Sequence, residues 1–195
     1  MALTKLGKYL ALSDLRNSDG KLGSESVVGL STQKQIILTK ASLDGVSLTS
    51  YKLFPPKHYA YVPDTSRRGD KMSLGYNTTK NTFLVSSISV VFFVSDTDNL
   101  LEDYLYMYFN RTEFDRYARF NSWGSAREAF SWEDMCDIDI DLPPLPVQRK
   151  YVDIYNAMLA NQRAYENGLE DLNAAISASV EEFKHTAPRV AVGSL

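Results

Sequence analysis

The sequence contains few of the residues that usually build catalytic or metal sites. Among its 195 residues, cysteine occurs once, at Cys136, and histidine twice, at His58 and His185. A single cysteine excludes a disulfide within the chain, and we therefore expect a cytoplasmic protein. No Cys/His cluster has the spacing of metal ligands, and no phosphate-binding loop or nucleophile motif is present. The sequence thus predicts neither metal binding nor catalysis by this chain.

Long apolar runs and a strong charge excess are also missing. The longest apolar run lies around 90–94, far below the roughly 20 residues of a membrane helix. The N-terminal residues lack the apolar core and cleavage site of a signal peptide. The net charge of -3 hides an asymmetry: residues 1–130 carry 16 Lys+Arg against 13 Asp+Glu, whereas residues 131–195 carry 5 against 11. Any contact with nucleic acid is therefore expected from local clusters in the first part.

Residues 1–144 have the pattern of one domain that mixes short strands and helices. β-branched and aromatic residues predict strands within 25–32, 35–39, 50–54, 58–62, 72–76 and 82–94. Helices are predicted at 100–110, with Asp98 or Asn99 as the cap, and at 112–120, with Thr112 as the cap. Residues 121–128 are expected to form a loop. The predicted fold class is α+β.

A short acidic segment closes this domain. Ser131 begins a Ser-x-x-Asp pattern that favours a helix start. Asp137, Asp139 and Asp141 then alternate with apolar residues, which predicts an edge strand with its carboxylates in water. A metal site at these carboxylates is the less favoured interpretation.

The pattern changes again at the prolines of 143–146, after which a helix is predicted over 145–186. Residues 187–195 are treated as a tail. Proline suits the first helical position and restricts the residue before it, so the prolines are expected to stiffen the connection to the helix. Large residues then recur in alternating steps of three and four, as in a coiled coil. One column contains Tyr155, Gln162, Leu169, Ile176 and Phe183; the other contains Tyr151, Met158, Tyr165, Leu172 and Ser179.

Such a helix cannot bury its apolar stripe against a domain of this size, so it requires a partner helix, most simply that of a second copy. A plain helix start after proline-rich sequence is the alternative. The residues predicted to carry dimerisation are Tyr151, Met158, Tyr165, Leu169, Leu172 and Ile176.

Three polar stretches in the domain are candidates for DNA contact. They contain Ser31, Thr32, Gln33 and Lys34; Arg67, Arg68 and Lys71; and Trp123, Ser125 and Arg127. Arg and Gln can read base edges with paired hydrogen bonds, while Lys, Ser and Thr contact phosphates. Tyr76 and Trp123 are expected to pack against sugar or a distorted base step. Ordinary polar surface loops are the alternative interpretation.

Taken together, these segments resemble one half of the DNA-specificity subunit of type I restriction–modification systems. The resemblance rests on a Gly-Ser-x-Arg loop, a Ser-Trp-x-Asp helix start and the Leu-Pro-Pro-Leu-Pro-Val-Gln junction before the long helix. The matching residues are Gly124, Ser125, Arg127, Ser131, Trp132, Asp134, Leu142, Pro143, Pro144, Leu145 and Gln148. The segments 29–32 and 59–77 also resemble family loops, although Val62 replaces an asparagine.

The resemblance implies a non-catalytic, sequence-specific DNA-binding subunit. Each recognition domain of the family reads one half of a split target, and the helices pair as an antiparallel coiled coil. The subunit positions methyltransferase subunits, which use S-adenosylmethionine, and nuclease-translocase subunits, which need ATP and Mg²⁺. No cofactor is expected on this chain.

The sequence departs from the family in containing one domain and one helix instead of two of each. We expect two copies to pair through their helices and to read a palindromic split site. Truncation of a longer subunit is an alternative origin. Two other functions stay open: a coiled-coil adaptor without a DNA role, and a recognition domain excised from a fused methyltransferase–nuclease.

Overall fold

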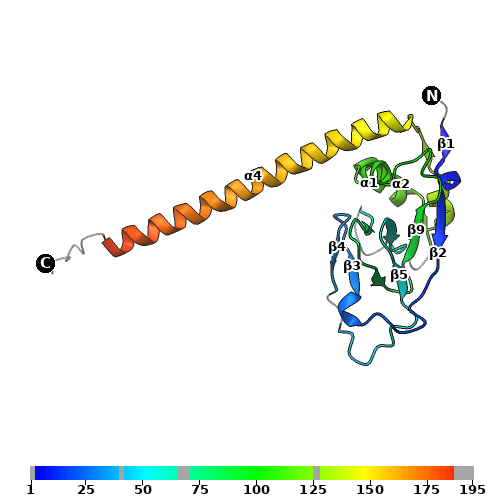
Figure 1. Cartoon of the computed structure of the whole chain (residues 1–195), viewed down its shortest axis with the longest axis horizontal. Helices are drawn as coiled ribbons and strands as arrows, with labels where there is room; N and C mark the ends of the chain where they lie inside the picture. Colours follow the sequence, from blue (N-terminus) through cyan, green and yellow to red (C-terminus); the bar gives the residue numbers. More distant parts are fainter. Residues whose placement is uncertain (1–2, 40–41, 66–70, 125–127, 187–195) are drawn as a thin grey trace. The chain divides into compact units, whose positions relative to one another are not determined.

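The structure is a computed structural model that describes residues 3–39, 42–65, 71–124 and 128–186. Its strands are β1 (Thr4–Lys5), β2 (Leu10–Ser13), β3 (Val28–Leu30), β4 (Ile36–Leu38), β5 (Lys52–Phe54), β6 (His58–Tyr61), β7 (Leu74–Tyr76), β8 (Phe83–Val85), β9 (Val90–Val94), β10 (Ser122–Trp123), β11 (Ala129–Phe130) and β12 (Asp139–Ile140). The α-helices are α1 (Glu102–Phe109), α2 (Thr112–Phe120), α3 (Trp132–Cys136) and α4 (Leu145–Thr186). The predicted α+β class is confirmed (Figure 1).

A four-stranded antiparallel sheet in the order β2-β9-β6-β7 forms the centre of the domain. In this sheet Tyr59 pairs with Phe92 on one neighbouring strand and with Tyr76 on the other. The ring of Tyr59 stacks on Phe92 at 5.0 Å and on Tyr76 at 4.7 Å between centroids. These cross-strand aromatic pairs fix the register, because a slip by one residue would turn every ring to the opposite face.

The two faces of the sheet contribute to separate cores. Alternation along β6 directs Tyr59 and Tyr61 into the larger core and Ala60 into a smaller one. Helices α1 and α2 contribute Phe109 and Phe114 to the larger core. Phe109 meets the Tyr59 ring edge-on at 5.7 Å, a favourable aromatic geometry. The tyrosines and phenylalanines of the domain therefore hold the helices against the sheet.

The N-terminal strands were not predicted from the sequence. Strand β2 lies at one edge of the central sheet beside β9. Strand β1 pairs with β12, the last strand of the domain in sequence. The pairing of β12 confirms the predicted acidic edge strand: Asp139 is exposed while Ile138 and Ile140 are buried. Lys5 on β1 lies 3.1 Å from the carboxylate of Asp139.

Two predicted helix caps were wrong and one was right. Leu101 and Arg111 occupy the cap positions of α1 and α2, and neither makes a side-chain capping bond. Ser131 does cap α3, since its hydroxyl oxygen accepts the Asp134 N–H. The predicted loop over 121–128 is also different, because its flanks pair as the hairpin β10-β11.

The long helix α4 has the predicted bounds and contains 42 residues, about 63 Å at about 1.5 Å per residue. The chain divides into two compact units, Met1–Val152 and Asp153–Leu195. The first two turns of α4 therefore belong to the domain, which extends beyond the predicted boundary at 144. Among the described residues, none of the helices is long and apolar enough to cross a bilayer.

Gln148 explains why the first turns of α4 belong to the domain. Its side chain is fully buried, and its amide nitrogen donates to the carbonyl oxygens of Asn99 and Pro143 at 2.7 and 2.8 Å. Its amide oxygen accepts the Leu101 N–H at 2.9 Å, at the start of α1. One glutamine thus joins the proline junction, the start of α1 and α4.

Candidate nucleic-acid interface

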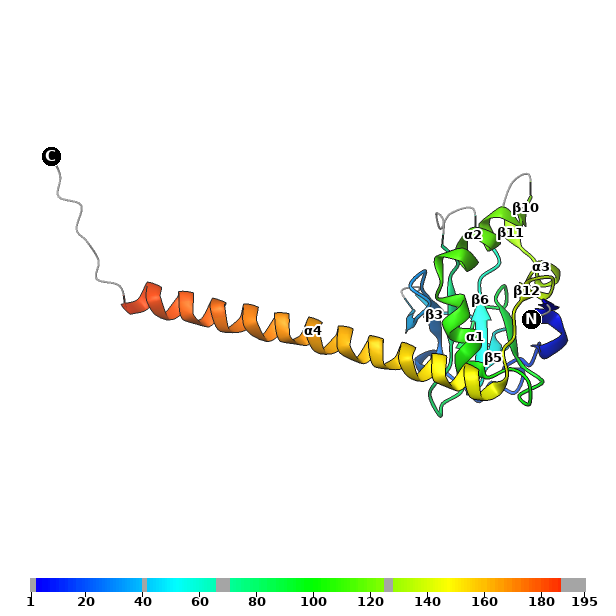
Figure 2. The same cartoon turned by 90° about the horizontal axis from the view of Figure 1, so that it is seen from above.

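The flanks of two predicted DNA-contact loops lie side by side at one end of the domain. Thr65 donates from its backbone N–H and its hydroxyl to the carbonyl oxygen of Glu128, at 2.9 and 3.1 Å. An antiparallel bridge joins Asp64 and Ala129 next to it. Figure 2 shows β10, β11 and α2 at this end. The loops that begin and end here contain Arg67, Arg68, Ser125 and Arg127, which lie outside the described residues.

A buried ion pair connects the third polar stretch to the same place. The Nζ atom of Lys34 lies 2.6 Å from Oδ1 of Asp115 on α2, and that oxygen also accepts the Met72 N–H at 2.9 Å. Burial lowers the pKa of Lys34, while Asp115 opposes this shift. The pair therefore ties the turn at 31–34, the segment after the 66–70 loop and α2 together.

The prediction that Lys34 contacts phosphate was wrong, because only 3% of the residue is exposed and its ammonium group is engaged with Asp115. The prediction for Tyr76 was wrong for a similar reason: its ring is buried against Tyr59 and Tyr106. Both residues instead support the end of the domain where the loops converge.

The turn at 31–34 leaves Gln33 exposed and Ser31 and Thr32 half-buried. The Ser31 hydroxyl oxygen accepts the Gln35 N–H at 3.1 Å, which shapes the turn. Lys34 has a positive φ of 60°, a conformation that costs free energy outside glycine. The buried ion pair offsets this cost and holds Gln33 at the surface.

Exposed groups on α2 and the hairpin extend the surface beyond the predicted residues. Trp123 is 67% exposed and Phe120 is 78% exposed. Arg116 and Arg119 are also on α2, where they pair with Glu113 and Glu128, respectively. Lys71 is exposed, and it directly precedes Met72, whose backbone N–H donates to Asp115 of α2. Sequence reasoning missed Phe120, Arg116 and Arg119, although the amphipathic pattern of 112–120 places them opposite its buried residues.

We call these neighbouring elements the loop end: the turn 31–34, the flanks 63–65 and 71–72, α2, and the hairpin flanks 122–124 and 128–130. Its exposed side chains include arginine, lysine, glutamine and two large aromatic rings. Those groups can donate to phosphates and base edges and can stack on bases. The loop end has the chemistry of a nucleic-acid contact surface.

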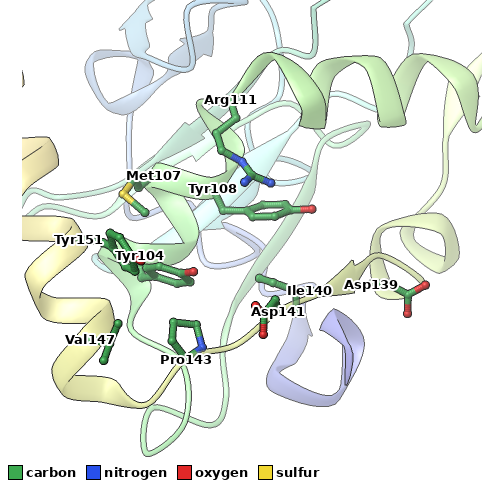
Figure 3. Close-up of a pocket in the computed structure, with 10 residues that line it drawn as sticks. All are labelled: Tyr104, Met107, Tyr108, Arg111, Asp139, Ile140, Asp141, Pro143, Val147 and Tyr151. Atoms are coloured by element: carbon green, nitrogen blue, oxygen red, sulfur yellow. The ribbon is translucent and has the colours of Figure 1, made fainter. Parts of the chain in front are cut away.

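A separate cleft lies between α1, β12 and the first turns of α4 (Figure 3). Its volume is about 400 Å³, and its wall includes Tyr104, Tyr108, Arg111, Asp141 and Tyr151. The guanidinium carbon of Arg111 stands 4.3 Å from the centroid of the Tyr108 ring. Tyrosine and arginine are enriched at protein–protein interfaces. Tyr151, predicted as a dimerisation residue, is part of this wall.

The acidic strand does not assemble a metal site. Within the described part of the chain, no group of three or more metal-ligating side chains is present. Lys5 lies within 3.9 Å of Asp137 and 3.1 Å of Asp139, so these carboxylates have a cation from the protein itself.

No protein-family model matches the sequence, and no curated protein sequence matches it. Solved structures do match. The HsdS subunit from Thermoanaerobacter tengcongensis is 14% identical, with a TM-score of 0.61 over 98% of this chain and 52% of that subunit. A chain from a type I R-M system, solved to explain complex assembly and conformational transition, is 14% identical, with a TM-score of 0.54 over 91% of this chain and 43% of the other.

This chain has the fold of HsdS. It spans about half the length of the HsdS structures that it matches. The described part of this chain contains one mixed α/β domain and one long helix, α4. The fold therefore agrees with the resemblance drawn from the loop and proline motifs.

Proposed function

We propose that this protein is a DNA-specificity subunit of a type I restriction–modification complex, in which each chain reads one half of a split target. The observation that carries this proposal is that the turn 31–34 and the described flanks of the other two polar stretches converge at the loop end of a domain with the HsdS fold. In this proposal the loop end contacts double-stranded DNA.

The chain itself supplies no catalysis in this proposal. Its role is to position a methyltransferase subunit, which uses S-adenosylmethionine, and a nuclease-translocase subunit, which uses ATP and Mg²⁺. Helix α4 pairs with α4 of a second copy, and the two identical domains read a palindromic target with a gap. The cleft beside Tyr104 and Tyr108 has the composition of a contact for one of the protein subunits.

The DNA contact is tested by measuring the affinity of the whole chain for double-stranded DNA at salt concentrations from about 50 to about 200 mM. Affinity that comes from phosphate contacts falls steeply over this range. Arg127→Ala should weaken binding and reduce the dependence on salt. Arg163→Ala, which removes the same charge from exposed α4, is the matched control and should bind as the unmodified chain does. Equal affinity of the two variants would remove Arg127 from the interface.

The specificity role is tested by co-expression with methyltransferase subunits and genome-wide mapping of N6-methyladenine. A gapped palindromic motif is the expected result. An asymmetric motif would contradict pairing of two identical chains. Absence of methylation together with absence of salt-dependent DNA affinity would favour the adaptor function instead.

A further inference from the structure

Two aromatic side chains at the loop end differ from the other large rings of the domain. Phe120, the last residue of α2, is 78% exposed, and Trp123 on β10 is 67% exposed. Every other phenylalanine and tryptophan that the structure describes between residues 3 and 152 is buried or half-buried. Two large exposed rings only three residues apart are therefore a candidate contact surface for another molecule.

Side-chain hydrogen bonds hold the segment between the two rings. Asn121 donates from its backbone N–H and its side-chain amide to the Tyr117 carbonyl oxygen, at 3.0 and 2.9 Å. The buried Ser122 donates from its hydroxyl to the Ala118 carbonyl oxygen at 2.6 Å. These bonds join α2 to β10, which follow each other at the loop end (Figure 2). The two rings therefore have a well-supported backbone, which a side chain that must enter another molecule requires.

Alternation along the β10-β11 hairpin turns Trp123 outward. Ser122 pairs with Phe130, and both are buried. Trp123 pairs with Ala129 on the opposite face of the hairpin. Because the methyl group of Ala129 is too small to cover an indole ring, the ring of Trp123 is available to a ligand.

The charge around the rings favours a polyanion as that ligand. The loop end together with its two loops carries seven basic and five acidic side chains, whereas the whole chain has a net charge of -3. These segments are residues 31–34, 63–72, 112–120 and 122–130. A positive region on a negatively charged chain is complementary to DNA, so the proposed ligand of the two rings is the double-stranded DNA of the proposed function.

Arg116 supplies a cation beside Phe120. The two residues are four positions apart on α2, so their side chains lie on the same face of the helix. Arg116 pairs with Glu113 at 3.5 Å, and both side chains are exposed. Because an exposed ion pair contributes little free energy, Arg116 can exchange this carboxylate for a DNA phosphate.

The side chain of Phe120 has no polar atom, so it gains free energy only where it reaches another apolar surface. The sugars and phosphates on the outside of a duplex are mostly polar. The faces of the bases are apolar, and they become accessible where a base step is unstacked. Proteins that kink DNA use this surface by inserting a side chain such as phenylalanine between two base pairs.

We propose that Phe120 inserts between two base pairs of the bound duplex while Trp123 packs against the neighbouring sugar. The proposal rests on the proposed function for DNA as the ligand, and it adds a way of reading sequence without hydrogen bonds to bases. Pyrimidine–purine steps, TA and CA/TG, unstack most easily. Part of the target is therefore recognised by the ease with which one step opens.

Selection from a library of random-sequence duplexes by the full-length chain tests this preference. The unmodified chain should enrich a pyrimidine–purine step at a fixed position in its motif. Phe120→Ala should reduce that enrichment at least about fivefold, as for the loss of one base-pair preference, and keep the rest of the motif. Phe120→Leu retains an apolar wedge and should restore the preference. Leu3→Ala, which shortens another exposed apolar side chain, is the control and should select as the unmodified chain does.

The fluorescence of 2-aminopurine, which rises when the base loses its stacking neighbours, tests the insertion itself. With 2-aminopurine in the enriched step, binding of the unmodified chain or of Phe120→Leu should increase the fluorescence, and binding of Phe120→Ala should not. An abasic site in that step should strengthen binding by the unmodified chain about tenfold, because unstacking is no longer required. Phe120→Ala should gain no affinity from the abasic site.

Three results would overturn the insertion and leave the proposed function standing. The first is that Phe120→Ala enriches the step and increases the fluorescence as the unmodified chain does. The second is a uniform loss of affinity of Phe120→Ala for all duplexes, which would make Phe120 an ordinary surface contact. The third is normal DNA selection by Phe120→Ala together with lost binding of a co-expressed methyltransferase subunit, which would assign the ring to a protein contact.

A fourth result separates failure of the function from failure of the insertion. If the unmodified chain shows no salt-dependent affinity for any duplex, the proposed function fails and the insertion fails with it. Circular dichroism of each variant accompanies these measurements, and the spectra should be unchanged because Phe120 and Leu3 are exposed.

Discussion

The ammonium group of Lys34 lies 2.6 Å from the carboxylate of Asp115, although the two residues are 81 positions apart in sequence. The same carboxylate holds the Met72 N–H. A residue expected to touch DNA phosphate is therefore an internal tie that holds the loop end together. Its effect on DNA binding is expected to be indirect, through the positions of the neighbouring loops.

Lys34→Met should lower the free energy of unfolding by about 3–5 kcal/mol, because it leaves the buried Asp115 carboxylate without its cation. Denaturant unfolding followed by circular dichroism measures this. Lys21→Met, which removes the lysine of an exposed pair with Asp19, is the control and should leave stability unchanged. Adding Asp115→Leu to Lys34→Met should restore part of the loss. Equal stability of Lys34→Met and the control would show that the ion pair does not stabilise the fold.

Gln148→Ala should destabilise the domain by about 2 kcal/mol, since it leaves the buried Pro143 carbonyl oxygen and the half-buried Leu101 N–H without a hydrogen bond. Hydrogen exchange should increase most at the start of α1 and in the first turns of α4. Asn156→Ala, at an exposed position of the same helix, should change neither measurement. Uniform exchange across the domain would contradict a local anchor.

Alkaline pH should unfold the domain through its buried tyrosines. Burial raises the pKa of Tyr59 and of Tyr61 above the ordinary value near 10. Above that value the unfolded chain releases these protons while the folded chain retains them, so the free energy of unfolding falls as pH rises. Each tyrosine contributes a slope of up to about 1.4 kcal/mol per pH unit.

The Tyr61→Phe variant removes one of these groups, and its hydroxyl makes only a long hydrogen bond of 3.5 Å to the Phe130 carbonyl oxygen. Its stability should therefore decline less steeply than that of the unmodified chain between pH 10 and about 12. Denaturant midpoints measured across this range provide the comparison. Identical slopes would show that Tyr61 does not retain its proton.

Gly168→Leu should weaken self-association at least about tenfold, because Gly168 precedes Leu169 of the coiled-coil column and the added side chain would collide with the facing helix of the proposed pair. Ala174→Leu places the same side chain on the opposite side of the helix and should leave association unchanged. Sedimentation equilibrium of the two variants gives the comparison. Equal association of the two variants would place Gly168 outside the interface.

Sequence patterns predicted most of the elements but not how they are joined. Alternation and β-branched residues located β3 to β9, and the Ser131 cap was correct because its capping bond is local. Strands β1 and β2 were missed, since each is completed by a partner far along the chain. The caps of α1 and α2 were misplaced because tertiary contacts, such as that of Gln148 to Leu101, replace a local side-chain cap.

The amino-acid sequence by itself determined the fold class, the long helix with its coiled-coil columns, and the three polar stretches, because hydrophobic period and turn chemistry act over a few neighbouring residues. Only the tertiary structure decided that the described flanks of those stretches meet at one end of the domain and that Lys34 and Tyr76 are buried. Exposure of a lysine or a tyrosine depends on partners such as Asp115 and Tyr59, which the folded chain brings from distant positions.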